Sequence, residues 1–260
     1  MLPYTLIELE SVDSTNDYLK RHKTDEEAPI TLVTAEFQTA GKGQRGNSWE
    51  SETGKNVVYS LMVHPRTIKP SQMFSISEVA ALSVCEALNE YLNAEQKEQT
   101  DGGFCVKWPN DIYYGNQKVA GILIETDLMG GRIDNAIIGV GININQREFV
   151  SDAPNPISLW QIKGEETNRQ EVLESIMKHF TCLYEQLEKG ELDTLHQHFM
   201  QQLYRKSGMH TYRDEQGTFE AIIADVELSG HLILKDESGT LRRYAFKEVS
   251  FCLPSLTERM

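Results

Sequence analysis

The loop at residues 39–49 restricts the possible folds of this chain more than any other segment. It contains three glycines, which expose backbone N–H groups, and two cations, Lys42 and Arg45. Free N–H groups combined with positive charge suit the binding of phosphate. A glycine-rich stretch in an acidic protein is also typical of a flexible surface turn, so the loop by itself leaves both interpretations open.

The glycine spacing in this loop matches a known fingerprint without its usual context. Gly41-x-Gly43-x-x-Gly46 has the spacing of dinucleotide-binding loops, which lead directly into a helix. The following residues, NSWESETG, do not begin a helix, and Asn47-Ser48 stand where a P-loop needs Lys and then Ser or Thr. The sequence also lacks the H-R-D and D-F-G motifs of protein kinases. The Rossmann and P-loop interpretations therefore fail on context, and a protein kinase is disfavoured.

Strand and helix patterns alternate along most of the chain. Alternating or β-branched segments predict strands at residues 2–9, 30–38, 55–63, 104–107, 112–114, 119–125 and 132–144. Helical spacing predicts helices at residues 15–23, from Ser71 onward, at 168–189 and at 191–204, the first with Asp13-Ser14 as its N-cap. Residues 132–144 could form an exposed strand that pairs across a homodimer, or equally an internal strand.

The last segment, residues 208–253, changes character. Short alternating runs (FEAIIADVEL, HLILKDE and LRRYAF) are separated by DEQG, LSG and DESG turns. Such strands joined by tight turns are typical of a small β-barrel of the SH3 type. We therefore predict a main domain at residues 1–205 and a C-terminal domain at residues 206–260.

Charge and cysteine content exclude several functional classes. Lys and Arg together number 25 and Asp and Glu 39, so the net charge is −14 and the molecule should repel nucleic acid. The four cysteines form no C-x-x-C pair, which favours buried thiols over disulfides or a zinc cluster. No signal peptide is recognisable, and no apolar run approaches the roughly 20 residues of a membrane-spanning helix. We expect a cytoplasmic protein with neither nucleic acid nor a membrane as partner.

A second candidate site begins with Lys107-Trp108-Pro109-Asn110-Asp111. Pro109 fixes the chain direction, and Asp111 leads into a predicted strand, so a carboxylate can be held rigidly there. A packed turn explains Trp108-Pro109 equally simply. Lys118 begins an otherwise apolar strand, where a lysine is costly unless it has an anionic partner. That partner could be Asp111, or a carboxylate or phosphate of a ligand.

The third candidate is Gly139-Val140-Gly141-Ile142-Asn143, where two glycines occupy alternate positions of a predicted strand. Missing side chains on one face would let a ligand or another backbone approach. A β-bulge or a tight contact between sheets would use the same pattern.

Together these motifs resemble those of one family, the biotin protein ligases. The ordered series of matches is Asp13-Ser14-Thr15-Asn16, QTAGKGQRG at 38–46, KWPND at 107–111, KVAG at 118–121 and GVGIN at 139–143. Each motif is weak alone, whereas the series is specific and covers essentially the whole chain. The resemblance implies an α+β fold, with a catalytic domain on a mixed sheet and an SH3-like C-terminal β-barrel. It also implies the reaction: biotin and ATP give biotinyl-5′-adenylate, and a lysine of a carrier domain then takes the biotinyl group.

The resemblance assigns a binding role to residues in every motif. Ser14, Thr15, Asn16 and Gln38 are expected around the ureido ring of biotin, a neutral urea that must be fully hydrogen-bonded once buried. The loop should fold over biotin and the adenylate, and Trp49 and the strand glycines should form the apolar wall. The remaining expected ligand-binding residues are Gly41, Lys42, Gly43, Gln44, Asn110, Lys118, Gly121, Gly139, Gly141 and Asn143.

Charge control is the main catalytic requirement of this reaction. A carboxylate must approach the α-phosphate although both are anionic, so Lys118 should bridge them, with Lys42, Arg45 and Mg²⁺ neutralising the phosphates. Asp111 is expected to orient or deprotonate the attacking amine of the carrier lysine. No protein ligand for a metal is predicted.

Two departures from the family pattern bear on function. Many members have G-R-G-R in the loop, where this chain has Lys42 and Gln44, and lysine lacks the bidentate geometry of arginine. We hypothesise that Arg45 partly compensates; otherwise the adenylate should escape more readily. The motifs begin at Asp13, which leaves no room for the N-terminal DNA-binding domain of some relatives, so we expect no repressor function.

The resemblance leaves two other functions to be tested. A lipoate–protein ligase should carry an R-R-x-S-G-G-G loop, which is absent here. A non-catalytic biotin sensor should have lost Lys118 or the loop cations, which are present. The expected partners are biotin, ATP and a biotin carboxyl carrier protein or domain, and the protein itself could be a monomer or a homodimer.

Overall fold

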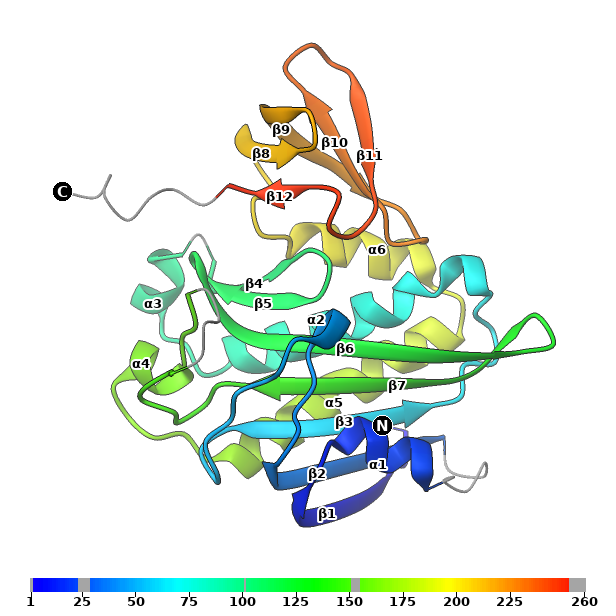
Figure 1. Cartoon of the computed structure of the whole chain (residues 1–260), viewed down its shortest axis with the longest axis vertical. Helices are drawn as coiled ribbons and strands as arrows, with labels where there is room; N and C mark the ends of the chain where they lie inside the picture. Colours follow the sequence, from blue (N-terminus) through cyan, green and yellow to red (C-terminus); the bar gives the residue numbers. More distant parts are fainter. Residues whose placement is uncertain (1, 23–28, 101, 151–154, 253–260) are drawn as a thin grey trace.

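The structure is a computed structural model and describes residues 2–22, 29–100, 102–150 and 155–252, with the side chain of Arg45 outside that description. Within these residues two β-sheets and a layer of helices make up the fold (Figure 1). The strands of the larger sheet are β1 (Thr5–Val12), β2 (Ile30–Gln38), β3 (Val57–Val63), β4 (Phe104–Lys107), β5 (Asp111–Tyr114), β6 (Gln117–Met129) and β7 (Arg132–Ile142). Those of the smaller sheet are β8 (His210–Asp214), β9 (Gly217–Val226), β10 (Leu232–Asp236), β11 (Leu241–Tyr244) and β12 (Ser250–Phe251).

The larger sheet is mixed, as predicted. Its order is β1-β2-β3-β7-β6-β5-β4, and β1 pairs with β2 in parallel while the other neighbours pair antiparallel. The predicted strand at residues 132–144 is β7, which lies between β3 and β6. From Ala136 to Ile142 both edges of β7 are hydrogen-bonded, so this part is an internal strand, whereas residues 132–135 pair with β6 alone.

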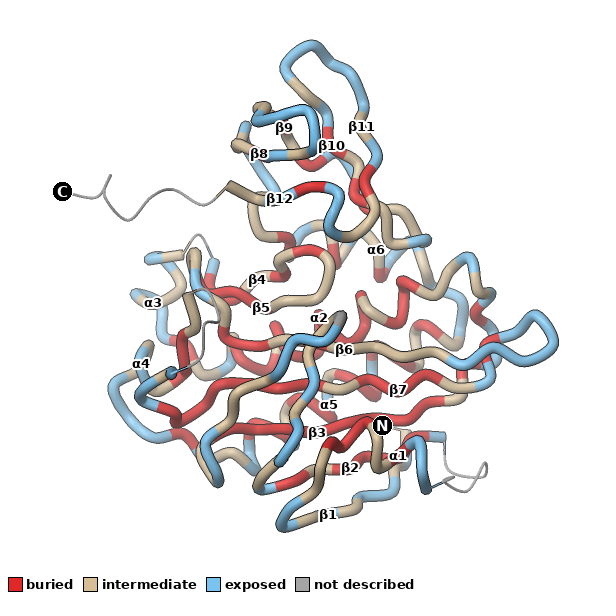
Figure 2. The backbone as a smooth tube through the Cα atoms, in the orientation of Figure 1, coloured by how far each residue is buried: buried red, intermediate tan, exposed pale blue. Residues whose placement is uncertain are grey.

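Helices cover one face of the larger sheet. Helices α2 (Phe74–Asn89) and α5 (Arg169–Glu188) lie behind it in Figure 1, and α6 (Leu192–Gln201) packs on both of them. Strand alternation sends Leu61, Ile138 and Ile142 toward these helices, where they are fully buried. Figure 2 shows long runs of buried residues along β3 and β7. Burial of these apolar side chains is the main stabilising contribution to the fold.

The opposite face of the larger sheet is only partly covered. Helix α1 (Thr15–Arg21) packs there through Leu19, which joins a small apolar cluster with Val33, Met62 and Ile137. Beside α1, the glycine-rich loop crosses over β6 and β7, and within it Gln44–Gly46 form a 3-10 helix, η1. The two polar motifs and the strand glycines therefore meet on this face.

The helix predictions needed three corrections. Pro70–Gln72 form a 3-10 helix, η2, so α2 begins at Phe74 rather than Ser71. The helix expected from Ser71 onward ends at Asn89, and a separate short helix, α3 (Ala94–Glu98), follows it. Helix α4 (Leu159–Lys163) was not predicted, because five residues are too few to show helical spacing. Ser14 stands at the N-cap of α1 as predicted, yet its hydroxyl makes no capping hydrogen bond, which leaves that hydroxyl for the pocket described below.

The C-terminal strands form an antiparallel sheet in the order β11-β10-β9-β8-β12, above α6 in Figure 1. Strands β11 and β12 lie at opposite edges, so the described residues form an open sheet and no closed barrel. Strand β12 has only two residues and pairs with β8 alone. The Arg205 guanidinium donates to the carbonyls of Thr211 and Cys252 and so holds the start of this sheet to its last strand. The domain boundary at residues 205/206 stays a prediction.

A helix that spans a membrane must be long enough and apolar enough to cross the bilayer. In the part of the chain that the structure describes, every helix is too short or too polar to cross a lipid bilayer.

Candidate functional site

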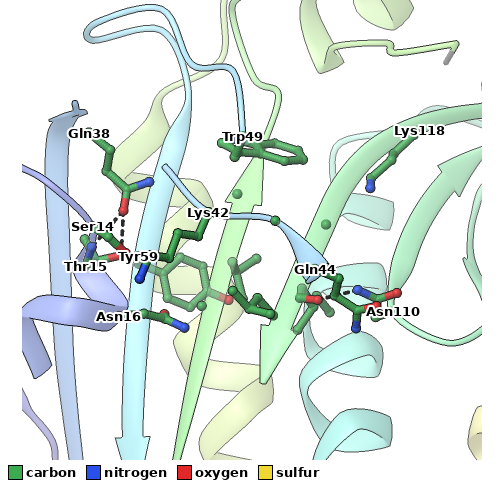
Figure 3. Close-up of a pocket in the computed structure, with 17 residues that line it drawn as sticks. Ser14, Thr15, Asn16, Gln38, Lys42, Gln44, Trp49, Tyr59, Asn110 and Lys118 are labelled. Atoms are coloured by element: carbon green, nitrogen blue, oxygen red, sulfur yellow. Dashed lines mark hydrogen bonds between the residues drawn. The ribbon is translucent and has the colours of Figure 1, made fainter. Parts of the chain in front are cut away.

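A pocket lies on the partly covered face of the larger sheet, where α1, the glycine-rich loop, β6 and β7 meet (Figure 3). Residues from all five matching sequence motifs contribute to it. Its lining consists of Ser14, Thr15, Asn16, Gln38, Lys42, Gly43, Gln44, Trp49, Tyr59, Asn110, Lys118, Gly121, Ile122, Leu123, Gly139, Val140 and Gly141. The lining is polar beside α1, flat and apolar in the middle, and charged at Lys118.

The polar end is built around the first turn of α1. Gln38 Oε1 accepts hydrogen bonds from the Thr15 backbone N–H (2.8 Å) and from the Thr15 hydroxyl (3.0 Å), which are drawn in Figure 3. A backbone N–H can only donate, so this contact fixes the orientation of the Gln38 amide. Its NH₂ group makes no hydrogen bond within the described residues and is available to a ligand. Ser14 and Asn16 are buried beside it.

Gly139 makes room for Asn16. A Cβ added at Gly139 would overlap the Asn16 side-chain amide, so only glycine lets that amide lie flat against β7. Ser60, fully buried on β3, lies within hydrogen-bond distance of both Asn16 Oδ1 (2.6 Å) and Thr15 Oγ1 (2.7 Å). The polar end is thus held together by contacts among strands β2, β3, β7 and helix α1.

The middle of the pocket is formed by Trp49 over two glycines. A Cβ at Gly141 would overlap the Trp49 indole, and a Cβ at Gly121 would lie 3.1 Å from its Cζ3 atom. The Trp49 backbone N–H donates to the Gly41 carbonyl (3.0 Å), which folds the loop back on itself. The alternate glycines therefore admit a side chain of the chain itself, rather than a bulge or a second backbone.

Two buried polar atoms in this region lack hydrogen-bond partners among the described residues. They are Trp49 Nε1 and Gln44 Oε1. An unpaired buried donor or acceptor costs about 1–3 kcal/mol, so such atoms need an explanation. Both belong to residues that line the pocket, so both atoms can pair with a polar ligand there.

The charged end of the pocket is an ion pair. Lys118 Nζ lies 2.7 Å from Asp111 Oδ1, and the two side chains are 28% and 20% exposed. The same ammonium lies 5.8 Å from the centroid of the Trp49 ring. The sequence left the anionic partner of Lys118 open between Asp111 and a ligand group, and in the structure Asp111 is a partner. A half-buried ammonium beside an aromatic wall suits an anionic ligand group.

The loop cations are placed differently from Lys118. Lys42 pairs with Asp17 of α1 at 2.6 Å, and this contact raises the pKa of the Lys42 ammonium. Lys42 therefore lines the pocket, but its ammonium group is paired with a carboxylate of α1 and not with a group inside the pocket. Arg45 belongs to η1, and the sequence-based role of its side chain lies outside the described residues.

Three predicted site residues do not line the pocket. Asp111 reaches it only through Lys118, and Gly41 supports Trp49 from behind through its carbonyl. The Asn143 amide donates to the Ile157 carbonyl (3.2 Å), and this contact ties the end of β7 to the segment before α4. The ligand contact expected of Asn143 therefore stays a prediction.

Sequence reasoning missed four pocket residues, namely Tyr59, Ile122, Leu123 and Val140. All are in strands that were predicted as core, and alternation alone does not show which core side chains reach a cavity. Burial raises the pKa of the Tyr59 hydroxyl, so that group stays neutral at physiological pH. A tyrosine in a strand of mainly apolar residues, VVYSLMV, was the available signal.

A second cavity adjoins this pocket and shares Gln44, Asn110 and Ile122 with it. It opens between the start of α2 and the smaller sheet. Its other lining residues are Phe74, Ser77, Pro109, Ile124, Ser229, Gly230, His231, Ala245 and Phe246. The two sheets therefore approach each other beside the charged end of the first pocket.

Comparisons with known proteins agree with this geometry. Residues 8–143 match the family described as "Biotin/lipoate A/B protein ligase family". The chain is 35% identical over 159 residues to the bifunctional ligase/repressor BirA of Bacillus subtilis (strain 168), covering 59% of this chain and 46% of that protein. It is 26% identical over 213 residues to a biotin–acetyl-CoA-carboxylase ligase of Paracoccus denitrificans, covering 80% of this chain and 85% of that one. The chain thus spans about half the length of the bifunctional relative.

A solved structure extends the likeness to the whole chain. The biotin protein ligase from Aquifex aeolicus, in complex with biotin and ATP, superposes with a TM-score of 0.74 at 27% identity. The match covers 95% of this chain and 97% of that one, so it includes the smaller sheet as well as the larger.

Proposed function

Because the chain belongs to the biotin/lipoate A/B protein ligase family, we propose that it is a biotin protein ligase. In this proposal it joins biotin and ATP into biotinyl-5′-adenylate and then transfers the biotinyl group to a lysine of a biotin carboxyl carrier domain. The observation that carries the proposal is one pocket with a neutral polar end, an aromatic and glycine-lined middle, and a half-buried lysine. Biotin has the same three parts in the same order: a urea, an aliphatic chain and a carboxylate.

The polar end suits a cyclic urea. A urea oxygen accepts hydrogen bonds and carries no charge, so neutral donors pair with it without the desolvation cost of an ion. The NH₂ group of Gln38 and the hydroxyl of Ser14 are such donors, and no charged group lies among the buried residues of this end. Selectivity against lipoate follows, because a dithiolane ring would leave these donors unpaired.

The first step requires two anions to meet. An oxygen of the biotin carboxylate attacks the α-phosphorus of ATP, the bond to the β-phosphate oxygen breaks, and pyrophosphate leaves. The Lys118 ammonium can neutralise the carboxylate and the developing charge on the α-phosphate. Asp111 is its ion-pair partner, and the Trp49 ring beside it carries no charge that would compete with the ligand. Lys42 can turn from Asp17 to the phosphates, since both side chains are partly exposed.

A magnesium ion would help to neutralise the phosphates of ATP in this step. Magnesium in such reactions binds chiefly to phosphate oxygens and water, with few protein ligands. The described residues contain no cluster of three or more His, Cys, Asp or Glu side chains arranged to hold a metal. The protein's own contribution is therefore assigned to Lys118 and the loop cations.

The second step joins the carrier to the acyl group. The neutral amine of the carrier lysine attacks the acyl carbon of the adenylate, AMP leaves, and the amine loses a proton. In this proposal Asp111, which adjoins the pocket through Lys118, accepts a hydrogen bond from that amine with the oxygen that Lys118 does not pair. The second cavity reaches Asn110, the chain neighbour of Asp111, and the apolar part of its wall, which includes Phe74, Ile124 and Phe246, suits the methylene chain of a lysine.

The experiment that tests the proposal is mass spectrometry of the two products. The purified chain is incubated with ATP, Mg²⁺ and biotin, first alone and then with a biotin carboxyl carrier domain. We expect biotinyl-5′-adenylate in the first reaction and a biotinylated lysine in the second, with a carrier in which that lysine is arginine as the control. Binding of biotin without either product would favour a sensor, and an adenylate formed only from lipoate would favour the lipoate ligase.

A further inference from the structure

Glu125, on the pocket-facing side of β6, has no role in the site described above. It lies outside the set of residues that line the pocket, and its side chain is 31% exposed. Its two carboxylate oxygens have different partners. Oε2 accepts a hydrogen bond from Asn16 Nδ2 (2.9 Å), and Oε1 pairs with Lys20 Nζ (2.6 Å).

This contact decides which end of the Asn16 amide faces which neighbour. An ionised carboxylate can only accept hydrogen bonds, so the Asn16 NH₂ group must face Glu125. Its oxygen must then face the Ser60 hydroxyl, which is fully buried and 2.6 Å away. Asn16 is itself buried against Gly139, so neither end can turn to water instead.

Orientation matters because Asn16 lines the pocket. In the observed orientation its second amide hydrogen is not used by Glu125 and remains available to a ligand. Together with the NH₂ group of Gln38, this makes the polar end a surface of hydrogen-bond donors. If the Asn16 amide were reversed, an oxygen acceptor would stand in the same place and would repel another acceptor.

We propose that Glu125 is a positioning residue that fixes Asn16 as a donor and thereby selects ligands with a neutral acceptor oxygen, such as a cyclic urea. This inference rests on the proposed function, since it concerns how the same pocket recognises biotin. Glu125 acts through Asn16 and does not touch the ligand. Ser60 completes the arrangement because a hydroxyl can either donate to Asn16 or accept from it.

A glutamine at position 125 has the same shape but only one acceptor oxygen. Lys20 and Asn16 would then compete for that oxygen, and a charged donor forms the stronger hydrogen bond. The oxygen would therefore face Lys20, and the glutamine NH₂ group would face Asn16. Asn16 would reverse, with its own NH₂ group donating to Ser60. Removal of the Lys20 ammonium should free the glutamine oxygen and return Asn16 to the donor orientation.

The test is calorimetric titration of biotin into the full chain and four variants, E125Q, K20M, K20M/E125Q and D127N. We expect E125Q to raise the Kd for biotin about tenfold, the effect of one unfavourable buried hydrogen bond. K20M should change the Kd for biotin by less than about twofold, because the Glu125 carboxylate still accepts the hydrogen bond from Asn16. The double variant should recover most of the affinity that E125Q loses.

D127N is the matched control, because it makes the same carboxylate-to-amide change two residues further along β6, where Asp127 contacts Asn135 on the surface. It should leave the Kd unchanged. Steady-state pyrophosphate release should show E125Q raising the KM for biotin with the kcat and the KM for ATP unchanged, a pattern that a merely structural role would not produce.

The outcomes separate the two proposals. A wild-type chain that binds no biotin would overturn the proposed function and this inference with it. A wild-type chain that binds biotin, with E125Q equal to it or with the double variant as weak as E125Q, would overturn the role of Glu125 alone. Melting temperatures of all variants establish that each one is folded.

Discussion

Replacement of Lys118 by methionine tests the charged end of the pocket. The substitution keeps the length of the side chain and removes its positive charge. A unit charge about 4 Å from a developing negative charge contributes about 4 kcal/mol at an effective dielectric constant near 20. Lys118 is 28% exposed, so solvent screens part of this, and about 3–4 kcal/mol is expected. That corresponds to a loss of roughly 10²–10³-fold in the rate of adenylation.

The assay for K118M is single-turnover formation of biotinyl-5′-adenylate with saturating biotin and ATP. K118R should retain much of the rate because it keeps the charge, although its planar group fits differently. K55M is the matched control, because Lys55 also pairs with a carboxylate, that of Glu166 at 3.3 Å, but lies outside the pocket lining. An adenylation rate in K118M equal to that of K55M, in a folded protein, would refute the electrostatic role of Lys118.

Loss of the Lys118–Asp111 pair should have a small effect on stability. Both side chains are partly exposed, and pairs of this kind contribute at most about 1 kcal/mol. K118M should therefore melt within a few degrees of the wild type. A large drop in melting temperature would mean that the pair is mainly structural.

Three further predictions concern other parts of the molecule. G141A should abolish most adenylation, because its Cβ overlaps the Trp49 indole and must displace the loop; normal activity in a pyrophosphate assay would contradict this. D17N should lower the KM for ATP about two- to fivefold by freeing Lys42 for the phosphates, and an unchanged or higher KM would show that the pair does not restrain it. His196 bridges Glu78 and Asp225 at 2.7 and 2.8 Å, and these contacts raise its pKa to about 9 from 6.5. A raised pKa stabilises the fold fully below pH 6.5, and the contribution disappears as the pH rises through about 9. H196Q should therefore lower the free energy of unfolding by about 1–3 kcal/mol at pH 6 and by little at pH 10, and an equal loss at both would disprove the bridge.

Much of the fold could be predicted from local pattern. The mixed order of strands and helices, the turns at Gly115-Asn116 and Gly130-Gly131, and the short C-terminal strands all follow from residue spacing. Pairing could not be predicted for β7, because an apolar strand with alternate glycines is compatible with either an edge or a central position. Only the neighbouring strands, β3 and β6, decide that it is internal.

The candidate site was predictable in its chemistry and less so in its contacts. Lys118 needed an anionic partner by charge alone, and Asp111 is that partner. Lys42 contacts Asp17, 25 positions away in the sequence, and Asn16 contacts Glu125, 109 positions away. No local sequence pattern links residues so far apart. Ser60 and Glu125 were missed for the same reason. The glycines at 139 and 141 were recognised, but what fills their space, Asn16 and Trp49, required the structure.

The most direct test of the account is pyrophosphate release by the purified chain with ATP and Mg²⁺, adding biotin or lipoate in turn. We expect release with biotin and none above background with lipoate, because the donors at the polar end pair with a urea oxygen. Release with lipoate alone, or no release with biotin under conditions where biotin binds, would contradict it.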